Sequence, residues 1–376
     1  MRYYLIAGEA SGDLHGSNLI KELRKRDDQA TIRCWGGDLM EKAGAQLVKH
    51  YRDLAFMGFV EVLRNLRTIF RNLDFCKKDI LEFNPDVIIL IDYPGFNIRI
   101  AKWAKEMGIR TIYYISPQVW AWKENRVKTI KRCVDLMLVI LPFEKEFYHK
   151  WQYEVEYVGH PLIEVIKDSK EKGVSDRIAD KPIVALLPGS RKQEILKKLP
   201  VMLETSKFFP DHQFVVAQAP GLEEEFYSNI LKPFPGVKAI KGKTYDLLKQ
   251  STAALVTSGT ATLETALFEV PEVVCYKGSP ISYMIAKRVI KVKYISLVNL
   301  IMDKLVVKEL IQDELSVKNL QTELSLILFD KQKIDSIKKD YKLLWELLSK
   351  GGNASAQAAA HILDFLKPNA SGKKSA

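Results

Sequence analysis

The chain has 376 residues, more than one ordinary hydrophobic core organises, and its 47% hydrophobic and 27% charged residues exclude an intrinsically disordered protein. No apolar run approaches the ~20 residues needed to span a bilayer. The net charge of +11 favours anionic lipids or phosphorylated substrates, and because no RNA-binding or helix-turn-helix signature accompanies it, we expect no nucleic-acid partner.

The four cysteines are scattered, with no CxxC pair and no nearby histidine cluster. This spacing indicates reduced, packed thiols of a cytoplasmic protein and no metal site. The apolar run Tyr3–Ala7 is too short for the core of a signal peptide.

Short β-branched runs alternate with longer amphipathic stretches along the whole chain. The first half contains candidate strands at Tyr3–Ala7, Thr31–Trp35, Val87–Ile91, Thr111–Ile115, Leu136–Leu141 and Val155–Val158. The second half repeats the pattern at Ile183–Leu187, Gln213–Ala217, Val237–Ile240, Ala253–Thr257 and Val273–Tyr276. Near-continuous apolar strands separated by helices predict two Rossmann-like, doubly wound parallel-sheet α/β domains. Their ligands are expected at the carboxyl ends of the strands, in the cleft between the domains.

The domain boundaries follow from breaks in this pattern. The polar stretch Lys167–Lys181 separates the two sets of strands and is expected to be a linker or a surface helix. We predict domains over residues 1–166 and 167–350, a helix over 351–367 that could cross back to the first domain, and a solvated tail over 368–376. Gly351 and Gly352 end one helix and Asn353 can cap the next.

The first candidate loop is Gly8–Gly16, directly after strand Tyr3–Ala7. Its GxxxGxxxG spacing differs from the GxGxxG dinucleotide fingerprint, and Glu9 and Asp13 would repel a pyrophosphate. Carboxylates together with Ser11 and His15 suit a hydroxyl-rich sugar instead. In the alternative interpretation Ser11 caps the first helix and the glycines serve packing, which accounts for Ser11 and Asp13 better than for Glu9.

The next segment, Phe59–Leu81, combines an apolar stripe at helical spacing with an adjacent basic face. The stripe consists of Val62, Leu63, Leu66, Ile69, Phe70, Leu73 and Ile80, and the basic face of Arg64, Arg67, Arg71 and Lys78. This pattern predicts an interfacial helix on anionic lipid, with membrane contacts at Arg64, Leu66, Arg67, Ile69, Phe70 and Arg71. The alternative is a helix packed on the core with a solvated basic face. The segment Ile281–Lys293 is a second basic candidate.

Asp92 closes the most apolar strand candidate, Val87–Ile91, and the turn Tyr93–Asn97 follows at once. A carboxylate at the carboxyl end of a central strand faces the expected ligand site, where it can take the proton of an acceptor hydroxyl as a general base. An aspartate at a strand end more often caps the next turn.

Two loops of the second half are suited to phosphate. Strand Ile183–Leu187 runs into Pro188-Gly189-Ser190-Arg191 and then a helix, so that backbone N–H groups and the Arg191 guanidinium can approach an anion. The Walker GK[ST] sequence is absent, which argues against a P-loop NTPase. The alternative is an ordinary turn with a surface arginine.

The second of these loops, Ser258–Glu264, follows strand Ala253–Thr257 and contains Ser258, Gly259 and Thr260 at a helix start. Glu264, about one turn further on, can accept both hydroxyls of a ribose. Alternatively, Ser258 or Thr260 is a helix cap and Glu264 faces solvent. Two such loops in one half favour a diphosphate with a ribose attached.

Motifs along most of the chain resemble those of the lipid-A-disaccharide synthase family of Gram-negative bacteria, inverting glycosyltransferases of the two-Rossmann-domain GT-B type. In the first half they are Gly8–Asp13, Met57-Gly58, Glu61–Leu63, Asp92–Asn97, Ser116–Trp122, Pro142–Glu144 and Gly159-His160. The second half adds Leu187–Arg191, Ser258–Ala261, Ser296–Leu300 and Lys308–Gln312.

The resemblance implies transfer of 2,3-diacylglucosamine from its UDP derivative to 2,3-diacylglucosamine 1-phosphate, which gives a β-1,6-linked disaccharide 1-phosphate and UDP. It also implies a peripheral location on the inner face of the inner membrane. No cofactor is implied, because backbone N–H groups and Arg191 can stabilise the leaving pyrophosphate.

The resemblance also implies roles for individual residues. Asp92 is the expected catalytic base, with Glu9 beside it. The implied UDP ligands are Gly189, Ser190, Arg191, Ser258, Gly259, Thr260 and Glu264. The implied substrate contacts are Ser11, His15, Asn97, Asn299, Glu309 and Gln312.

Two residues depart from the family pattern: Asp38 and Val298 each stand where proline is usual. Either departure could shift a loop, the second of them the loop that carries Asn299. A UDP-sugar 2-epimerase of the same fold and a non-catalytic nucleotide-sugar-binding module are the alternative functions, and a homodimer is left open.

Overall fold

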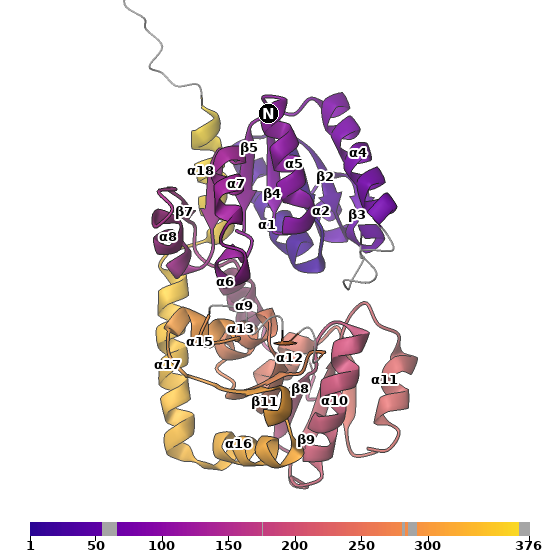
Figure 1. The fold of residues 1–376 in the computed structure, drawn as a ribbon. Helices are drawn as coiled ribbons and strands as arrows, with labels where there is room; N and C mark the ends of the chain where they lie inside the picture. The colour runs from indigo at the N-terminus through magenta and orange to yellow at the C-terminus, as the bar shows by residue number, and fades with distance from the viewer. Residues whose placement is uncertain (55–65, 175, 280–282, 285–291, 368–376) are drawn as a thin grey trace, which may run out of the picture. The chain divides into compact units, whose positions relative to one another are not determined.

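The computed structural model describes residues 1–54, 66–174, 176–279, 283, 284 and 292–367. The chain divides into two compact units, Met1–Pro161 with Ser349–Ala376 (unit 1) and Leu162–Leu348 (unit 2). Figure 1 shows each unit as an α/β fold. Arg64, Met57-Gly58, Glu61–Leu63 and most of Ile281–Lys293 lie outside the described residues.

The described part of unit 1 contains a seven-stranded parallel sheet with the order β3-β2-β1-β4-β5-β6-β7. Its strands are β1 (Arg2–Ala7), β2 (Thr31–Gly36), β3 (Gln46–His50), β4 (Val87–Ile91), β5 (Thr111–Tyr114), β6 (Leu136–Val139) and β7 (Glu156–Tyr157). Its helices are α1 (Ala10–Arg26), α2 (Asp38–Lys42), η1 (Tyr51–Leu54), α4 (Leu66–Phe83), α5 (Pro94–Glu106), α6 (Val119–Trp122), α7 (Arg126–Cys133), α8 (Pro142–His149) and α18 (Ala354–Leu366).

The described part of unit 2 repeats this architecture with a six-stranded parallel sheet in the order β10-β9-β8-β11-β12-β13. Its strands are β8 (Ile183–Leu187), β9 (Gln213–Gln218), β10 (Lys238–Lys241), β11 (Ser251–Thr257), β12 (Glu272–Tyr276) and β13 (Lys308–Ile311). Its helices are α9 (Leu162–Glu171), α10 (Lys192–Ser206), α11 (Glu224–Leu231), α12 (Thr244–Gln250), α13 (Thr260–Leu267), α15 (Leu297–Met302), η2 (Gln312–Glu314), α16 (Val317–Phe329) and α17 (Lys331–Ser349).

The predicted fold class, two doubly wound parallel-sheet domains, is confirmed. Strand β4 shows why its sequence is apolar throughout. Ile88 and Leu90 enter one apolar cluster, while Val87, Ile89 and Ile91 enter another. A strand buried on both faces needs apolar residues at every position. The sequence prediction missed two edge strands, β3 and β13, because each mixes polar with apolar residues. The Lys167–Lys181 stretch begins within α9, and no strand or helix is assigned to its described residues after Glu171.

The C-terminal helix α18 packs against α1 in unit 1, and its residues Ala358, Ala359 and Ile362 join the apolar cluster on that face. The Asn353 side chain caps this helix by accepting a hydrogen bond from the N–H of Ala356 at 2.6 Å. Just before the cap, a Cβ on Gly351 would lie 2.3 Å from the Cα of Gly159. Only glycine permits this backbone contact, which holds the start of the α18 segment against Gly159, two residues after β7.

Both departures from the family pattern, Asp38 and Val298, lie in the first turn of a helix, α2 and α15 respectively. The first turn is where a helix accepts proline, since its N–H groups lack intrahelical partners. Replacing proline there therefore leaves the helix start intact.

Candidate functional site

The candidate base Asp92 lies at the carboxyl end of β4, beside the Gly8–Gly16 loop. Strands β1 and β4 are neighbours with Ala7 opposite Ile91, so the residues that follow them, Gly8-Glu9 and Asp92-Tyr93, lie at the same sheet edge. Asp92 and Tyr93 both adopt left-handed backbone conformations, with φ of 44° and 48°. Such conformations are strained for residues other than glycine, and such strain is concentrated at functional sites.

Hydrogen bonds fix the backbone of Asp92 in this conformation. Its carbonyl oxygen accepts from the Tyr113 hydroxyl at 2.6 Å and from the Asn97 side chain at 2.8 Å, while its N–H donates to the Tyr114 carbonyl at 3.3 Å. The Tyr93 ring lies so close to Gly8 that a Cβ there would be 2.3 Å from it. The glycine-rich loop and the Asp92 turn therefore pack directly against each other, with no room for a side chain at position 8.

The carboxyl group of Asp92 is half-buried and lies near that of the exposed Glu9. Burial and, second, the Glu9 charge raise the pKa of Asp92 from 3.8 to about 7. A carboxylate of this basicity can accept a proton from a sugar hydroxyl near neutral pH far better than an ordinary surface aspartate.

The structure gives Asn97, predicted as a substrate contact, a different role. Its side chain is fully buried, and its amide nitrogen donates to the carbonyls of Ile6, Ile91 and Asp92. Asn97 thus joins the ends of β1 and β4 and positions Asp92. We propose that Asn97 is a positioning residue, because its side chain is buried and its amide nitrogen bonds to the backbone of the Asp92 turn.

His15 and Ser11 differ in accessibility. His15 is buried, and burial lowers its pKa to about 4; it interacts with the buried His160, whose pKa is lowered to about 3. Both imidazoles are therefore neutral at physiological pH. Ser11 is exposed at the sheet edge, and it is not the helix cap, since α1 begins at Ala10 with Glu9 as its N-cap.

Asp13 serves packing, as the alternative interpretation of the loop held. Its buried carboxylate accepts hydrogen bonds from the N–H groups of Gly37, Leu39 and Met40 at 2.8, 3.1 and 3.0 Å. These groups form the start of α2, so Asp13 satisfies donors that the helix itself leaves open.

We therefore expect Asp13→Ala to destabilise unit 1 by about 1–3 kcal/mol, because it leaves buried N–H groups without a hydrogen-bond acceptor. Thermal unfolding measures this loss, with Ser11→Ala in the exposed first turn of the same helix as the matched control. If Asp13→Ala unfolded at the wild-type temperature and lost only activity, Asp13 would be a ligand and not a cap.

In unit 2, the predicted phosphate loops lie side by side at one sheet edge, because β8 and β11 are adjacent and parallel. After β8, Gly189 takes a φ of 114°, Ser190 is exposed, and Arg191 is the N-cap residue of α10. The Arg191 guanidinium, half of its side chain exposed, lies 3.5 Å from the Glu194 carboxylate. An anion at this helix start would meet backbone N–H groups and a forked cation.

The Ser258 loop has the same arrangement after β11. Gly259, with a φ of 149°, is the N-cap residue of α13, and Thr260 is exposed in its first turn. The Ser258 hydroxyl donates to the carbonyl of Ile295 at 2.8 Å, which ties this loop to the segment before α15. Neither Ser258 nor Thr260 caps α13 with its side chain.

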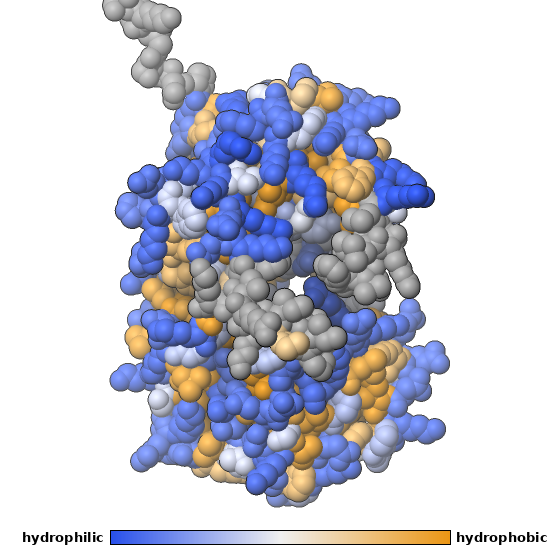
Figure 2. All heavy atoms as spheres, in the orientation of Figure 1, coloured by the Kyte–Doolittle hydropathy of each residue, from blue (hydrophilic) through white to orange (hydrophobic). Residues whose placement is uncertain are grey.

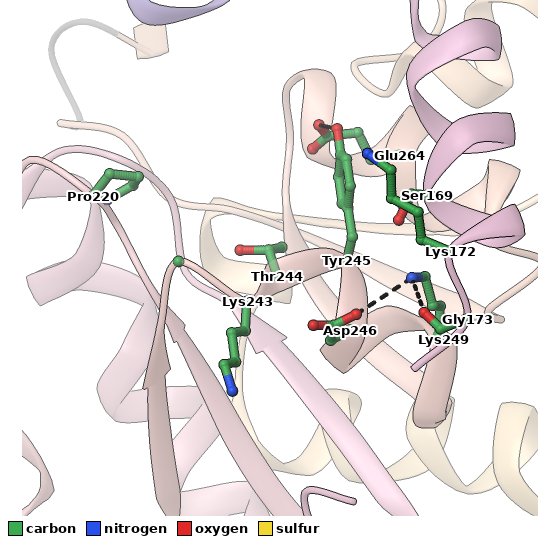
Figure 3. Close-up of a pocket in the computed structure, with 11 residues that line it drawn as sticks. Ser169, Lys172, Gly173, Pro220, Lys243, Thr244, Tyr245, Asp246, Lys249 and Glu264 are labelled. Atoms are coloured by element: carbon green, nitrogen blue, oxygen red, sulfur yellow. Dashed lines mark hydrogen bonds and ion pairs between the residues drawn. The ribbon is translucent and has the colours of Figure 1, made fainter. Parts of the chain in front are cut away.

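A cavity of about 560 Å³ lies at this edge of unit 2 (Figure 3). Glu264 on α13 and Tyr245 on α12 meet in its wall, where the Tyr245 hydroxyl donates to Glu264 at 2.8 Å. Burial raises the pKa of Glu264. The wall also includes Lys172, Lys243, Thr244 and Lys249. Sequence reasoning missed these residues, although Gly242, with a φ of 71°, marks a turn just after β10.

Asn299 and Glu309, predicted as donor contacts, hold each other in the core. The Asn299 amide group donates to the Val307 carbonyl and to Glu309, and its oxygen accepts from the N–H groups of Val306 and Val307. Glu309 also accepts from the N–H groups of Ile295 and Ser296. Every polar atom of the Asn299 side chain is thus occupied, and we propose that both residues are positioning groups for the segment that Ser258 contacts.

Gln312, at the end of β13, accepts a hydrogen bond from the N–H of Gly278 at 2.9 Å and has a φ of 55°. Its partly exposed side chain joins the ends of β12 and β13. Within the described ranges, no group of three His, Cys, Asp or Glu side chains is arranged to hold a metal ion. None of the described helices combines the length and apolar character required to cross a bilayer.

The model of a family described as lipid-A-disaccharide synthetase matches residues 3–363 of the chain. A lipid-A-disaccharide synthase of Syntrophus aciditrophicus (strain SB) is 40% identical over 373 residues, covering 96% of this chain and 97% of the relative. One from Geobacter metallireducens (strain ATCC 53774 / DSM 7210 / GS-15) is 38% identical over 376 residues, covering 97% of each.

Solved structures share the fold at much lower identity. A UDP-GlcNAc 2-epimerase from Neisseria meningitidis superposes with a TM-score of 0.67 at 13% identity, covering 97% of this chain and 100% of that one. The glycotransferase of kitacinnamycin gives a TM-score of 0.66 at 15% identity, covering 97% and 99%. At such identities the likeness shows the fold alone.

Proposed function

Because this chain belongs to the lipid-A-disaccharide synthase family, it is a glycosyltransferase that forms the lipid A disaccharide, and we propose that its two units divide the substrates. Unit 1 binds the acceptor, 2,3-diacylglucosamine 1-phosphate, and unit 2 binds the donor, UDP-2,3-diacylglucosamine. The products are the β-1,6-linked disaccharide 1-phosphate and UDP.

The Asp92 carboxyl group, with a pKa of about 7 at the end of β4, is the observation that carries this proposal. Ionised Asp92 takes the proton of the acceptor hydroxyl as that oxygen attacks the anomeric carbon. The bond from this carbon to the UDP oxygen breaks on the opposite face, so the anomeric configuration inverts. Glu9 raises the basicity of Asp92 through its charge.

Unit 2 holds the leaving group. The loops Gly189–Arg191 and Ser258–Thr260 present helix N-termini from neighbouring strands, and Arg191 adds a cationic contact for the pyrophosphate. Glu264 accepts the ribose hydroxyls, because a carboxylate that already accepts one bond from Tyr245 retains further lone pairs. The adjoining cavity receives the nucleoside.

Incubating the purified protein with UDP-2,3-diacylglucosamine and 2,3-diacylglucosamine 1-phosphate tests this assignment. We expect UDP and a disaccharide 1-phosphate in equal amounts, identified by mass spectrometry. Conversion of UDP-GlcNAc to its 2-epimer without acceptor would instead support the epimerase alternative. UDP binding with neither reaction would support a binding module.

We further propose that α4 brings unit 1 to an anionic membrane surface on the cytoplasmic side. Arg67 and Arg71 are exposed on this helix, and Phe70 and Phe75 are 53% and 47% exposed. In Figure 2, apolar and strongly hydrophilic side chains lie next to one another over the region where Figure 1 places α4. Acyl chains that stay in a bilayer require such a surface on the enzyme.

The surface that we propose is smaller than the one predicted from the sequence. Leu73 and Ile80 are buried in the core of unit 1, and Ile69 packs against it. We therefore propose Phe70, and not Ile69, as the apolar membrane contact, since Ile69 is partly buried against this core. Nothing is assigned to the side chain of Leu66 or to Arg64, which lie outside what is described.

Changing Arg67, Phe70 and Arg71 together to Ser is expected to reduce flotation with anionic liposomes at low salt. Each basic residue near such a surface contributes about 1 kcal/mol, and salt screens this attraction. The matched control is Lys145→Ser with Lys150→Ser, which removes two exposed charges of the same unit, one within α8 and one at its C-cap. Equal flotation of the triple variant and the wild type at every salt concentration would place the docking surface elsewhere.

A further inference from the structure

Helix α10 carries a buried cation that the reaction scheme above does not use. The Lys198 side chain is 2% exposed, yet it forms no hydrogen bond or ion pair with any residue that the structure describes. Buried ammonium groups are normally paired, because removing one from water is costly. Burial lowers the pKa of Lys198, while the nearby Glu194 carboxylate acts in the opposite direction.

The position of Lys198 links it to the two phosphate loops. Side chains on a helix lean toward its N-terminus, which for α10 is the end that carries Arg191. Lys198 interacts electrostatically with Arg191, with Glu194 and with the Cys275 thiol. Cys275 lies opposite Thr257 in the register of β12 and β11, so Lys198 lies under the strand end that leads into the Ser258 loop.

Thr257 adds an unsatisfied buried group at the strand end that leads into the Ser258 loop. Its hydroxyl is buried and has no hydrogen-bond partner among the described residues. A Cβ on Gly189 would lie 3.5 Å from the Thr257 methyl group, so this residue adjoins the Gly189 loop. Unpaired buried polar groups of this kind are expected where a ligand completes the bonding.

Glu194 supplies the third observation. One of its carboxylate oxygens lies 2.8 Å from the point where a Cβ of Gly189 would be, and the other lies 3.5 Å from the Arg191 guanidinium. A carboxylate thus stands next to the Gly189 backbone and the Arg191 side chain. This is the position in which the proposed function places a phosphate group.

We propose that Glu194 takes the place of a phosphate in the nucleotide-free protein and that a nucleoside diphosphate displaces its carboxylate toward Lys198. The inference rests on the proposed function, because it requires the diphosphate to bind at the Gly189 loop. In the free protein Glu194 keeps Arg191 oriented. When the diphosphate arrives, Lys198 offsets the charge of the displaced carboxylate and of the phosphate above it, which would otherwise repel one another.

Calorimetric titration with UDP tests the exchange in four proteins: the wild type, Lys198→Met, Glu194→Gln and the double variant. We expect Lys198→Met to bind UDP about ten-fold more weakly, on the scale of one charge-assisted contact. Glu194→Gln should bind UDP more tightly than the wild type, because the competing carboxylate is gone. The double variant should return to within a few-fold of the wild type, because the charge that Lys198 offsets is absent.

Two controls separate binding from folding. Lys197→Met removes an exposed lysine from the adjacent position of α10 and should leave UDP affinity unchanged. Without nucleotide, Lys198→Met should unfold at the wild-type temperature or above it, since it removes a desolvated charge. Uridine, which lacks phosphate, should bind all variants alike.

Unchanged UDP affinity in Lys198→Met, or a double variant as weak as Lys198→Met alone, would overturn the exchange. Arg191→Ala distinguishes this failure from failure of the proposed function. If Arg191→Ala weakens UDP binding while Lys198→Met does not, only the exchange is wrong. If neither change matters, the diphosphate does not bind at this loop.

Discussion

Asp92→Asn is expected to lower turnover by ~10²–10⁴, the usual loss when a general base is removed, with the fold and UDP affinity kept. Asparagine has nearly the shape of aspartate but cannot accept the proton of the acceptor hydroxyl. The backbone bonds that Tyr113 and Asn97 make to residue 92 use its carbonyl oxygen and are independent of its side chain. Steady-state assays with both substrates measure the loss, and near-normal turnover would remove Asp92 from the mechanism.

The pH profile provides an independent check on the same residue. Because the base must be ionised and its pKa is about 7, kcat/KM should rise with pH through neutrality. Glu9→Gln removes the second cause of that raised pKa and should move the acidic limb to lower pH. If the acidic limb of the pH profile did not move in this variant, Glu9 would have no influence on the pKa of Asp92.

The raised pKa of Asp92 also determines the direction in which the stability of the folded protein changes with pH. Folding raises this pKa from 3.8 to about 7, so the folded protein binds the proton more tightly. The associated stability is present at low pH and is lost as pH rises through about 7. Asp92→Asn should therefore melt at a higher temperature than the wild type at pH 8, with the difference vanishing near pH 4.

Arg191→Ala is expected to weaken UDP binding by about 10–100-fold, because hydrogen bonds to charged groups contribute about 1.5–3 kcal/mol. The guanidinium stands at the N-terminus of α10, where its charge adds to that of the free N–H groups. Acceptor binding should be almost unaffected, since only the pyrophosphate carries charge at this loop. Calorimetric titration with UDP measures the change.

The matched control for Arg191→Ala is Arg177→Ala, an equal loss of charge at an exposed position of unit 2. Arg177 bonds to the carbonyls of Ala179 and Asp180 and belongs to neither phosphate loop. Unchanged UDP affinity in Arg191→Ala, or an equal decrease in both variants, would place the nucleotide away from the Gly189 loop.

Several buried polar residues of the family motifs hold loops in place. Asn97 supports the Asp92 turn, while Asn299 and Glu309 support the segment contacted by Ser258. Substituting such a residue would reduce activity without any contact to substrate. Loss of activity alone is therefore a poor guide to the ligand contacts of this protein.

The sequence by itself determined the fold class and pointed to the strand ends at which we propose that the chemistry occurs. Strands such as β4 are buried on both faces. This burial requires a continuous run of apolar residues, which is recognisable in the sequence. In parallel sheets the carboxyl ends of strands share one edge, so Asp92, Arg191 and Ser258 could be predicted as site residues from their position directly after strands. All of these predictions depend only on residues that are close to one another in the sequence.

Tertiary structure alone decided what each polar side chain does. The motifs implied that Asn299 and Glu309 contact the substrate. Only the tertiary structure shows that they form hydrogen bonds with one another and with the backbone. Ile69 and Phe70 are neighbours in one apolar stripe, yet the first is partly buried against the core of unit 1 and the second is exposed. Tyr245 and Lys198 approach Glu264 and Glu194 respectively only after folding. The physical reason is that hydrogen bonding and burial depend on neighbours distant in sequence, which no local pattern records.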